Sequence, residues 1–447
     1  MNDSVNIFWF RRDLRYFDNH GFFQALNDYS PVIPLFIFDT DILNDLTDKY
    51  DKRLNFIYHK LNQLNTVFQD YKSSILIEKG KPVDVFAELI KQYNVKGVFT
   101  NRDYEPYAIN RDKEVEDFLN NHDIHLKTFK DQVIFEKDEV TKSNGEPYSV
   151  YTPYSRTWKR RFTKKHIQQY DSENYLNNLY SKQFNFPFLE DIGFKPSFIS
   201  YPDESPSEEI IKNYHLYRNL PAKDATSKLG IHLRFGTVSI RKMIKLGQKL
   251  NETWLNELIW RDFYMMILYH HPYVINKEFK PSYRWIPWRQ AEEDFKRWQE
   301  GLTGYPMVDA GMRQLNETGY MHNRVRMVTA SFLVKHLLID WRWGEAYFAE
   351  KLLDYELASN NGNWQWVAST GCDAQPYFRI FNPWSQQERY DPECTYIKQW
   401  VSELADIPPK TIHKWYKQKE SRNGYPLPCI NHDEERDEAK KRYKAVV

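Results

Sequence analysis

The first 130 residues of the chain alternate short apolar segments with amphipathic helical patterns, and this alternation restricts the fold more than any other feature. The apolar segments are rich in valine, isoleucine and phenylalanine and span residues 5–10, 32–38, 74–78, 97–101 and 125–129. Strands that alternate with helices favour a parallel sheet with helices on both faces. No G-x-G-x-x-G motif follows the first segment, so an ordinary dinucleotide-binding fingerprint is absent. We therefore expect a doubly wound, Rossmann-like α/β domain over residues 1–130.

The pattern changes after residue 130. Residues 131–205 are polar and interrupted by proline, glycine and serine, which is typical of a long connector between domains. Within this connector, residues 154–165 interleave basic and aromatic side chains, which indicates a solvated helix face first and a contact to a DNA backbone second. From residue 206 to residue 447 long helical patterns take over. We therefore predict an all-α domain over residues 206–447.

The composition limits the function classes that remain. The formal net charge is +1, so any nucleic-acid binding must come from a local patch and not from the overall charge. The cysteines, Cys372, Cys394 and Cys429, lack the spacing of metal ligands, which predicts a reducing compartment, no structural disulfide and no metal site. No apolar run is long enough to span a membrane, and the N-terminus lacks a signal-peptide pattern. We expect a cytoplasmic protein.

The stretch from Asp354 to Trp384 joins carboxylates, a run of amides and two tryptophans two residues apart. Polar side chains such as Asp354 and Asn360 are costly to bury unless something hydrogen-bonds them. A planar cofactor with polar edges, held beside Trp364 and Trp366, would meet that requirement. An aromatic-rich core helix with a solvated N-terminal face explains the same residues equally well.

Two other groups of residues carry chemistry. Thr226, Ser227 and the cation that follows them suit a pyrophosphate, although such a pair is more often a helix N-cap. Glu257, Trp260 and Arg261 lie three and four residues apart and therefore share one helix face. That spacing alone usually means a surface ion pair beside a core tryptophan.

These motifs occur together in the order typical of the photolyase/cryptochrome family, and the chain resembles that family over nearly its whole length. In detail it is most similar to bacterial class I cyclobutane pyrimidine dimer (CPD) DNA photolyases. The resemblance implies a lyase that repairs ultraviolet-damaged DNA, duplex or single-stranded, without an obligate protein partner and as a monomer. Reduced FAD in the helical domain would donate an electron, under light, to a dimer flipped out of the helix, as photolyases do.

The resemblance implies FAD contacts for residues spread over the helical domain. They are Tyr214, Thr226, Ser227, Lys228, Leu229, Gly230, Trp254, Glu257, Arg261, Asn323, Arg326, Asp354, Tyr355, Glu356 and Asn360. Three of them depart from the family pattern, because Lys228 stands where Arg is usual, Gly230 where Ser is usual and Glu356 where Asp is usual. Lysine cannot form the bidentate fork of arginine, so the phosphate contacts are expected to differ.

By the same resemblance, a second group of residues binds DNA and the lesion. The DNA-binding residues are Arg218, Trp260, Asn323, Arg324, Met327 and Trp366. Glu257 would act as a catalytic residue that hydrogen-bonds the pyrimidine carbonyls, and Trp260 and Trp366 would be the aromatic walls around the dimer. The resemblance also implies that Arg326 pairs with Asp354 over the flavin.

Further catalytic roles follow from the resemblance. Asn360 matches the amide that faces flavin N5 in photolyases, where plant cryptochromes place Asp and insect cryptochromes place Cys. Trp364, Trp341 and Trp288 match an electron-transfer chain to the surface, although each of them alone is more typical of a core residue.

Two other functions share this fold. A blue-light photoreceptor without repair activity is disfavoured by Asn360, Trp366 and Glu257, and by a chain that ends at Val447 without a long signalling tail. A (6-4) photolyase is disfavoured by Asn323, because those enzymes carry a histidine there.

The resemblance also implies a second, light-harvesting chromophore in the N-terminal domain. The segment from Asn101 to Tyr107 is more similar to deazaflavin-type sites than to folate-type sites, so 8-hydroxy-5-deazaflavin is favoured over FMN or methenyltetrahydrofolate. The candidate contacts are Arg11, Phe36, Asp39, Asp103 and Glu105. A loop of ordinary polar residues around an empty pocket remains the alternative.

Overall fold

The computed structural model describes residues 4–446, which form two compact units of three segments each. The first unit consists of Met1–Val140, Thr157–Pro206 and Lys228–Lys249. The second unit consists of Thr141–Arg156, Ser207–Ser227 and Leu250–Val447. Residues 131–205 therefore contribute to both units, and the three-part division into 1–130, 131–205 and 206–447 stays a prediction.

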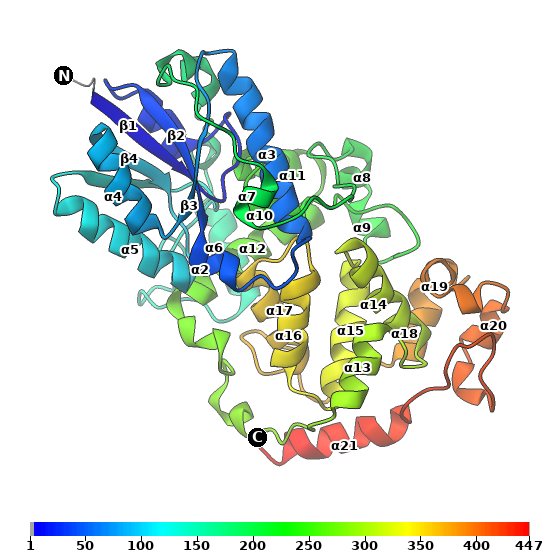
Figure 1. Cartoon of the computed structure of the whole chain (residues 1–447). Coiled ribbons are helices and arrows are strands. Elements are labelled where there is room, and N and C mark those ends of the chain that lie inside the picture. Colours follow the sequence, from blue (N-terminus) through cyan, green and yellow to red (C-terminus); the bar gives the residue numbers. More distant parts are fainter. Residues whose placement is uncertain (1–3, 447) are drawn as a thin grey trace. The chain divides into compact units, whose positions relative to one another are not determined.

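A five-stranded parallel sheet with the order β3-β2-β1-β4-β5 forms the centre of the first unit (Figure 1). The strands are β1 (Ser4–Phe10), β2 (Val32–Asp39), β3 (Leu76–Gly80), β4 (Asn94–Asn101) and β5 (His125–Phe129). Ile7 of β1 pairs with Ile33 of β2 on one side and with Val98 of β4 on the other. The predicted α/β fold is confirmed, with β3 beginning two residues later than expected.

Helices cover both faces of this sheet because successive strand residues point to opposite sides. The α-helices of this unit are α1 (His20–Leu26), α2 (Thr40–Asn44), α3 (Lys52–Gln69), α4 (Pro82–Gln92), α5 (Pro106–Asn120), α7 (Leu189–Ile192), α10 (Gly230–Phe235) and α11 (Ile240–Leu250). Trp9 of β1 packs on Phe86 of α4 with ring centroids 5.4 Å apart. Its neighbour Phe10 packs on Phe22 of α1 and Phe68 of α3 on the other face. All these rings are buried.

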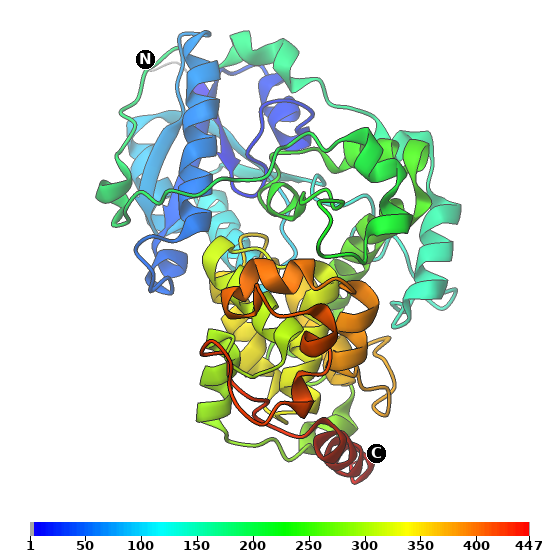
Figure 2. The same ribbon diagram turned by 90° about the vertical axis from the view of Figure 1, so that its right-hand side faces the viewer.

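The second unit is built of helices, as the sequence predicted. They are α8 (Glu208–Lys212), α9 (Tyr214–Tyr217), α12 (Glu252–His270), α13 (Glu292–Glu300), α14 (Pro306–Thr318), α15 (Asn323–Lys335), α16 (Trp341–Lys351), α17 (Leu357–Ala368), α18 (Pro383–Tyr390), α19 (Thr395–Trp400), α20 (Pro409–Ile412) and α21 (His432–Lys444). One more helix, α6 (Tyr151–Arg161), begins in this unit and ends in the first. Figure 2 shows the orange C-terminal helices beside the yellow-green helices, in agreement with the packing of α19 on α14.

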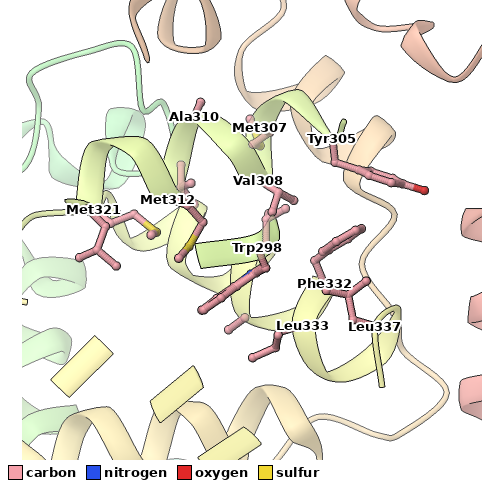
Figure 3. Packing of buried hydrophobic residues seen from close by; sticks show 14 of the residues in the cluster. Trp298, Tyr305, Met307, Val308, Ala310, Met312, Met321, Phe332, Leu333 and Leu337 are labelled. Carbon is pink, nitrogen blue, oxygen red and sulfur yellow. The ribbon is translucent and has the colours of Figure 1, made fainter. Parts of the chain in front are cut away.

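A large apolar core holds these helices together (Figure 3). Trp298 of α13 is fully buried among side chains of α14 and α15, which include Met312 and Leu333. Its indole Nε1 donates to the backbone oxygen of Thr329 over 3.0 Å, so the one polar atom of the ring is satisfied inside the core. The chemistry-bearing helices α12, α15, α16 and α17 therefore rest on a packed interior.

Within residues 4–446, no helix is long and apolar enough to cross a membrane. The same residues contain no cluster of three or more His, Cys, Asp or Glu side chains that could hold a metal ion. Cys372, Cys394 and Cys429 are free thiols.

Four charged side chains form a buried network in the first unit. Arg15 and Arg241 both donate to Asp131, over 2.6 and 2.8 Å, and Arg241 also donates to Asp18 over 2.9 Å. None of these side chains is more than 5% exposed. Burial alone would raise the pKa of Asp131, but the two guanidinium groups lower it to about 2. The network joins the loop after β1 to α11 and to the segment after β5.

We predict that Asp131→Asn destabilises the protein, because it leaves two buried guanidinium groups short of an anion. Breaking a buried ion pair by removing one partner costs about 3–5 kcal/mol, and urea unfolding measures the loss. The unfolded-state pKa of Asp is about 3.9, so the native contribution is complete above that value and disappears as the pH falls from about 4 to about 2. Asp45→Asn, at an exposed position, is the control. Equal stability of the two variants at pH 7 would contradict the prediction.

Candidate functional site

A pocket of about 350 Å³ opens in the second unit between α12, α15, α16 and α17. Its volume and mixed polar and aromatic lining are typical of small-molecule sites. The predicted site residues that line it are Arg218, Glu257, Trp260, Arg261, Asn323, Arg326, Met327, Asp354, Tyr355, Glu356, Asn360, Trp364 and Trp366. Residues from 218 to 366 of the sequence therefore meet in one cavity, as the resemblance implied.

One face of α12 supplies a wall of the pocket. Glu257, Trp260, Arg261 and Tyr264 lie at positions i, i+3, i+4 and i+7, so the helix repeat aligns them. Asn251 caps the helix, since its side chain accepts a hydrogen bond from the backbone N–H of Trp254. The wall is thus part of a 19-residue, capped helix and is not a loop.

Three ion pairs organise the charges around the pocket. Arg218 contacts Glu257, Arg261 donates to Glu356 over 2.9 Å, and Arg326 donates to Asp354 over 2.9 Å. The Arg326–Asp354 pair agrees with the expectation from the resemblance, and Glu356 reaches Arg261 in spite of its extra methylene. Each pair joins residues that are distant in sequence, so the charges also fix the relative positions of the pocket's elements.

The carboxyl group of Glu257 lies in an environment that favours its neutral form. Burial raises its pKa above the ordinary value, and the nearby Arg218 guanidinium opposes that rise in part. The side chain is still 36% exposed, because it opens into the pocket. Glu257 therefore faces the pocket with a carboxyl group that can form hydrogen bonds to a ligand.

Asp354 presents an acceptor that nothing in the protein uses. Its Oδ2 accepts from Arg326, whereas its Oδ1 is buried and has no hydrogen-bond partner within residues 4–446. A buried carboxylate oxygen without a partner is costly, and a donor N–H on a ligand would satisfy it. The pocket therefore fits a planar group with an N–H edge, such as the ring system of FAD.

The amide of Asn360 is oriented by its neighbour on α16. Its Nδ2 donates to the Glu345 carboxylate over 2.8 Å and to the Glu345 backbone oxygen over 3.1 Å. Both amide hydrogens are therefore used, and Oδ1 is the atom that Asn360 offers to the pocket. Burial raises the pKa of Glu345, and the hydrogen bond from Asn360 lowers it.

Two glycines let α17 approach its neighbours. A Cβ at Gly362 would lie 2.2 Å from Cδ1 of Tyr264 on α12. A Cβ at Gly344 of α16 would lie 2.1 Å from Cη2 of Trp364 on α17. Real Cβ atoms do not approach other carbons so closely, so any larger residue at either position must displace a ring of the pocket wall.

Seven predicted cofactor contacts are not among the described residues that line the pocket, namely Tyr214, Thr226, Ser227, Lys228, Leu229, Gly230 and Trp254. The hydroxyl oxygen of Thr226 lies 3.1 Å from the hydroxyl oxygen of Tyr320. The hydroxyl oxygen of Ser227 accepts a hydrogen bond from the indole Nε1 of Trp254 over 3.3 Å. The boundary between the units falls after Ser227, so Lys228, Leu229 and Gly230 belong to the first unit. The two halves of this predicted phosphate segment are therefore described in different units, and its joint contacts stay a prediction.

Two predicted cations, Arg218 of the pocket lining and Arg324 of α15, lie against aromatic side chains. The Arg218 guanidinium lies 5.2 Å from the ring centroid of Tyr214. Arg324 donates to Oδ1 of Asn219 over 2.8 Å and lies 4.4 Å from the ring centroid of Tyr390. Arg218 and Arg324 thus both lie against aromatic rings.

The three predicted electron-transfer tryptophans belong to one apolar cluster. Trp364 lines the pocket, Trp341 is fully buried and donates to Glu278 over 3.2 Å, and Trp288 is partly buried at the edge of the cluster. Their roles in electron transfer stay predictions.

The predicted antenna residues gather at the carboxyl edge of the sheet in the first unit. Arg11 follows β1, Asp39 ends β2, and Asp103 and Glu105 follow β4, whereas Phe36 is buried within β2. The strand order reverses between β1 and β4, and ligands of open α/β sheets bind at such a point.

Ion pairs and hydrogen bonds already satisfy these polar residues. Arg12 donates to Asp103 over 3.1 Å and to Glu105 over 2.9 Å, and the hydroxyl of Tyr107 donates to Asp39 over 2.6 Å. Arg11 pairs with Asp112. Burial would raise the pKa of Asp103, but the surrounding arginines hold it well below its usual range.

The sequence analysis missed several residues of the pocket. They are Tyr264, Ala330, Phe348, Leu352, Ser359, Asn363 and Val367. Tyr264 could have been found, because it continues the helix face of Glu257 and Trp260 at the next turn. Phe348 and Leu352 read as ordinary core residues in the sequence, and only the packing of α16 places them in the lining.

Comparisons with known proteins agree with this site. A family model described as DNA photolyase matches residues 6–171, and a model described as the FAD binding domain of DNA photolyase matches residues 254–445. The chain is 34% identical to a deoxyribodipyrimidine photo-lyase of Halobacterium salinarum, over 97% of this chain and 98% of the relative. The residues that line most of the pocket therefore belong to an FAD-binding domain.

Solved structures give the same result for the fold. A bacterial class III photolyase from Agrobacterium tumefaciens aligns with a TM-score of 0.86 at 32% identity, over 100% of this chain and 98% of that chain. An archaeal photolyase from Sulfolobus tokodaii aligns with a TM-score of 0.81 at 35% identity, over 99% of this chain and 100% of that chain.

We predict that Gly362→Ala weakens both stability and flavin binding, because the new methyl group pushes Tyr264 or α17 out of place. Overpacking of this kind costs about 1–3 kcal/mol. Urea unfolding measures the first effect, and the ratio of flavin to protein absorbance after purification measures the second. Replacing the ring with a smaller side chain, in Tyr264→Leu, should reduce the loss of stability that Gly362→Ala causes in the double variant. Penalties that simply add would contradict the proposed clash.

Proposed function

This chain belongs to the DNA photolyase family, and we propose that it repairs cyclobutane pyrimidine dimers in ultraviolet-damaged DNA in a light-driven reaction. The observation that carries the proposal is that the Glu257 carboxyl and the indoles of Trp260 and Trp366 line the same pocket as Asn360. A hydrogen-bonding acid, two flat apolar walls and an oriented amide are the groups that a dimer and a flavin together require.

The proposed cofactor is FAD, which when bound in its reduced form supplies the excited electron that splits the dimer and takes it back. Asp354 would accept from an N–H of the flavin's pyrimidine edge with its unused Oδ1, and its ion pair with Arg326 holds that carboxylate in place. Asn360 offers Oδ1 to N5, since its Nδ2 is held by Glu345. Thr226 and Ser227 are proposed for the phosphates, together with Lys228.

Glu257, Trp260 and Trp366 are proposed to hold the flipped-out dimer. The raised pKa of Glu257 favours a carboxyl group that donates to a pyrimidine carbonyl and stabilises negative charge on the base. The indoles stack on the apolar faces of the dimer and exclude water from it.

DNA contacts outside the lesion are proposed for two cations, Arg218 and Arg324. Arg218 and Arg324 neutralise phosphates, while Asn323 and Met327 lie beside them on the first turns of α15. Affinity should fall as salt rises, because phosphate contacts release counterions. The protein would act as a monomer, in the cytoplasm with the DNA.

Trp364, Trp341 and Trp288 are proposed to carry electrons between the pocket and the surface and so to keep the cofactor reduced. The proposal is supported by their common apolar cluster, in which Trp364 lines the pocket and Trp288 is only partly buried.

A light-harvesting chromophore is proposed for the carboxyl edge of the sheet in the first unit, with Arg11, Asp39, Asp103 and Glu105 nearby. The S. tokodaii structure is described as holding two FAD molecules, with the implication of a novel light-harvesting cofactor. We favour 8-hydroxy-5-deazaflavin for this chain, ahead of FMN or methenyltetrahydrofolate. Release of bound chromophores by denaturation, followed by absorption spectroscopy and mass spectrometry, distinguishes the three.

The direct test is a repair assay. The purified protein is reduced, mixed with ultraviolet-damaged oligothymidine and illuminated with blue light, and the return of thymine absorbance is followed against a dark control. We expect recovery only in the light. No recovery with flavin bound and fully reduced would overturn the proposal, and a (6-4) lesion substrate then separates the remaining repair function from a photoreceptor.

Glu257 gives a sharper prediction. Glu257→Gln keeps a donor and an acceptor of nearly the same shape, whereas Glu257→Ala removes both. The alanine variant should bind a dimer-containing oligonucleotide about tenfold more weakly, since a hydrogen bond to a charged or strongly polarised group is worth about 1.5–3 kcal/mol. The glutamine variant should lose less. Equal affinity of the alanine variant and the unmodified protein would contradict the role given to Glu257.

A further inference from the structure

The outer side of the pocket wall carries a tyrosine from a distant part of the sequence. Tyr151 stacks face to face on Trp260, with ring centroids 3.6 Å apart and planes within 5° of each other. This is the shortest centroid separation among the ring pairs found in the described residues. The two residues are more than one hundred positions apart in the chain but belong to the same unit.

Two hydrogen bonds hold Tyr151 in this position. Its hydroxyl donates to the backbone oxygen of Asn256 on α12 over 3.0 Å. Its backbone N–H donates to Oδ2 of Asp373 over 3.1 Å. That N–H is one of the unpaired donors at the start of α6, so a carboxylate there is favourable both as a cap and against the helix dipole.

The partners of Tyr151 lie on α12 and in the loop that follows α17. Asn256 and Trp260 belong to α12, whereas Asp373 lies in the loop that follows α17, seven residues after Trp366. Asp373 has a left-handed backbone, with φ of 46°. That conformation is uncommon outside Gly, Asn and Asp, and the loop is therefore held in a specific shape.

Tyr151 is not one of the described residues that line the pocket. It occupies one face of the Trp260 indole from outside, so the indole cannot swing away from the cavity without breaking the stack. Tyr264 and Phe263 restrict the same indole from α12, at 5.5 and 5.6 Å between centroids. Tyr151 also hydrogen-bonds the loop after α17 through its backbone N–H.

We propose that Tyr151 is a positioning residue that sets the orientation of Trp260 and its spacing from Trp366, and thereby determines the preference for a dimer over undamaged bases. This inference rests on the proposed function. A preformed slot of fixed width accepts a rigid, joined pair of pyrimidines, and the ordering of the Trp260 side chain is already complete before DNA binds. A mobile indole must be ordered on binding, which weakens the complex with the lesion but not the phosphate contacts to ordinary DNA.

The test measures lesion preference and repair separately in the flavin-loaded, full-length protein. Tyr151→Ala removes the stack and the hydroxyl, Tyr151→Phe keeps the stack, and Tyr29→Ala, at a fully exposed position, is the control. For each variant, affinity is measured for an oligothymidine with one dimer and for the same undamaged oligothymidine. Repair per absorbed photon is measured with the lesion site saturated.

We expect Tyr151→Ala to lower the affinity for the dimer about tenfold and to leave the affinity for undamaged DNA unchanged. Repair per absorbed photon at saturation and flavin content should also stay unchanged. Tyr151→Phe should restore most of the preference, because only the bond to Asn256 is lost. Asp373→Ala should lower the preference in the same direction by a smaller factor, and it keeps the proposal testable if Tyr151→Ala folds poorly.

Two outcomes would overturn the inference. An unchanged ratio of the two affinities in both Tyr151→Ala and Asp373→Ala would show that the stack does not set the preference. An equal loss of affinity for damaged and undamaged DNA, without rescue by Tyr151→Phe, would show a general structural role. If the unmodified protein itself shows neither preference nor repair, the proposed function fails, and that failure is distinct because it is seen before any substitution.

Discussion

The close approach of α17 to its two neighbours is the constraint on which the pocket depends. Gly362 of α17 leaves room for the ring of Tyr264 on α12, and Gly344 of α16 leaves room for the ring of Trp364 on α17. A side chain at either glycine would separate the helices that carry Glu257, Asn360 and the indole walls. The width of the pocket therefore follows from two missing Cβ atoms, and the aromatic rings that fill the space become its lining.

Packing sets the separation of these helices, and ion pairs then fix their positions relative to one another. Arg261–Glu356 and Arg326–Asp354 each join a helix to the segment that leads into α17, and both are wholly or largely buried. Buried pairs are weak sources of net stability, because desolvation offsets the Coulomb attraction. Their value here is geometric, since any slippage of one element would leave a buried charge alone. Oδ1 of Asp354, which has no hydrogen-bond partner within residues 4–446, marks a point where a ligand would complete the arrangement.

Much of this arrangement could be predicted from the sequence, for physical reasons that differ between the units. The sheet could be predicted because its strands are nearly continuous apolar runs. A run such as the one that contains Ile7 and Phe10 is typical of a strand that is buried on both faces. The shared face of Glu257, Trp260 and Arg261 could also be predicted, because helix periodicity places these residues on one side of a helix. Two sets of contacts could not be predicted, because they join residues that share no local sequence pattern. They are the Arg15–Asp131–Arg241 network and the hydrogen bond from Asn360 to Glu345.

The contact between Tyr151 and Trp260 is another one that joins distant parts of the sequence, and it bears on the proposed function. In the sequence Tyr151 is one aromatic residue of the polar connector, three positions before the basic and aromatic stretch of residues 154–165. In the structure its ring completes a stack with Trp260, and its backbone joins the loop after α17. Gly362 lets α12 and α17 pack closely, and Tyr151 joins α12 to the loop after α17 through its stack and its two hydrogen bonds. A wall supported on both sides keeps its shape without a ligand, and a planar lesion then meets a surface that is already formed.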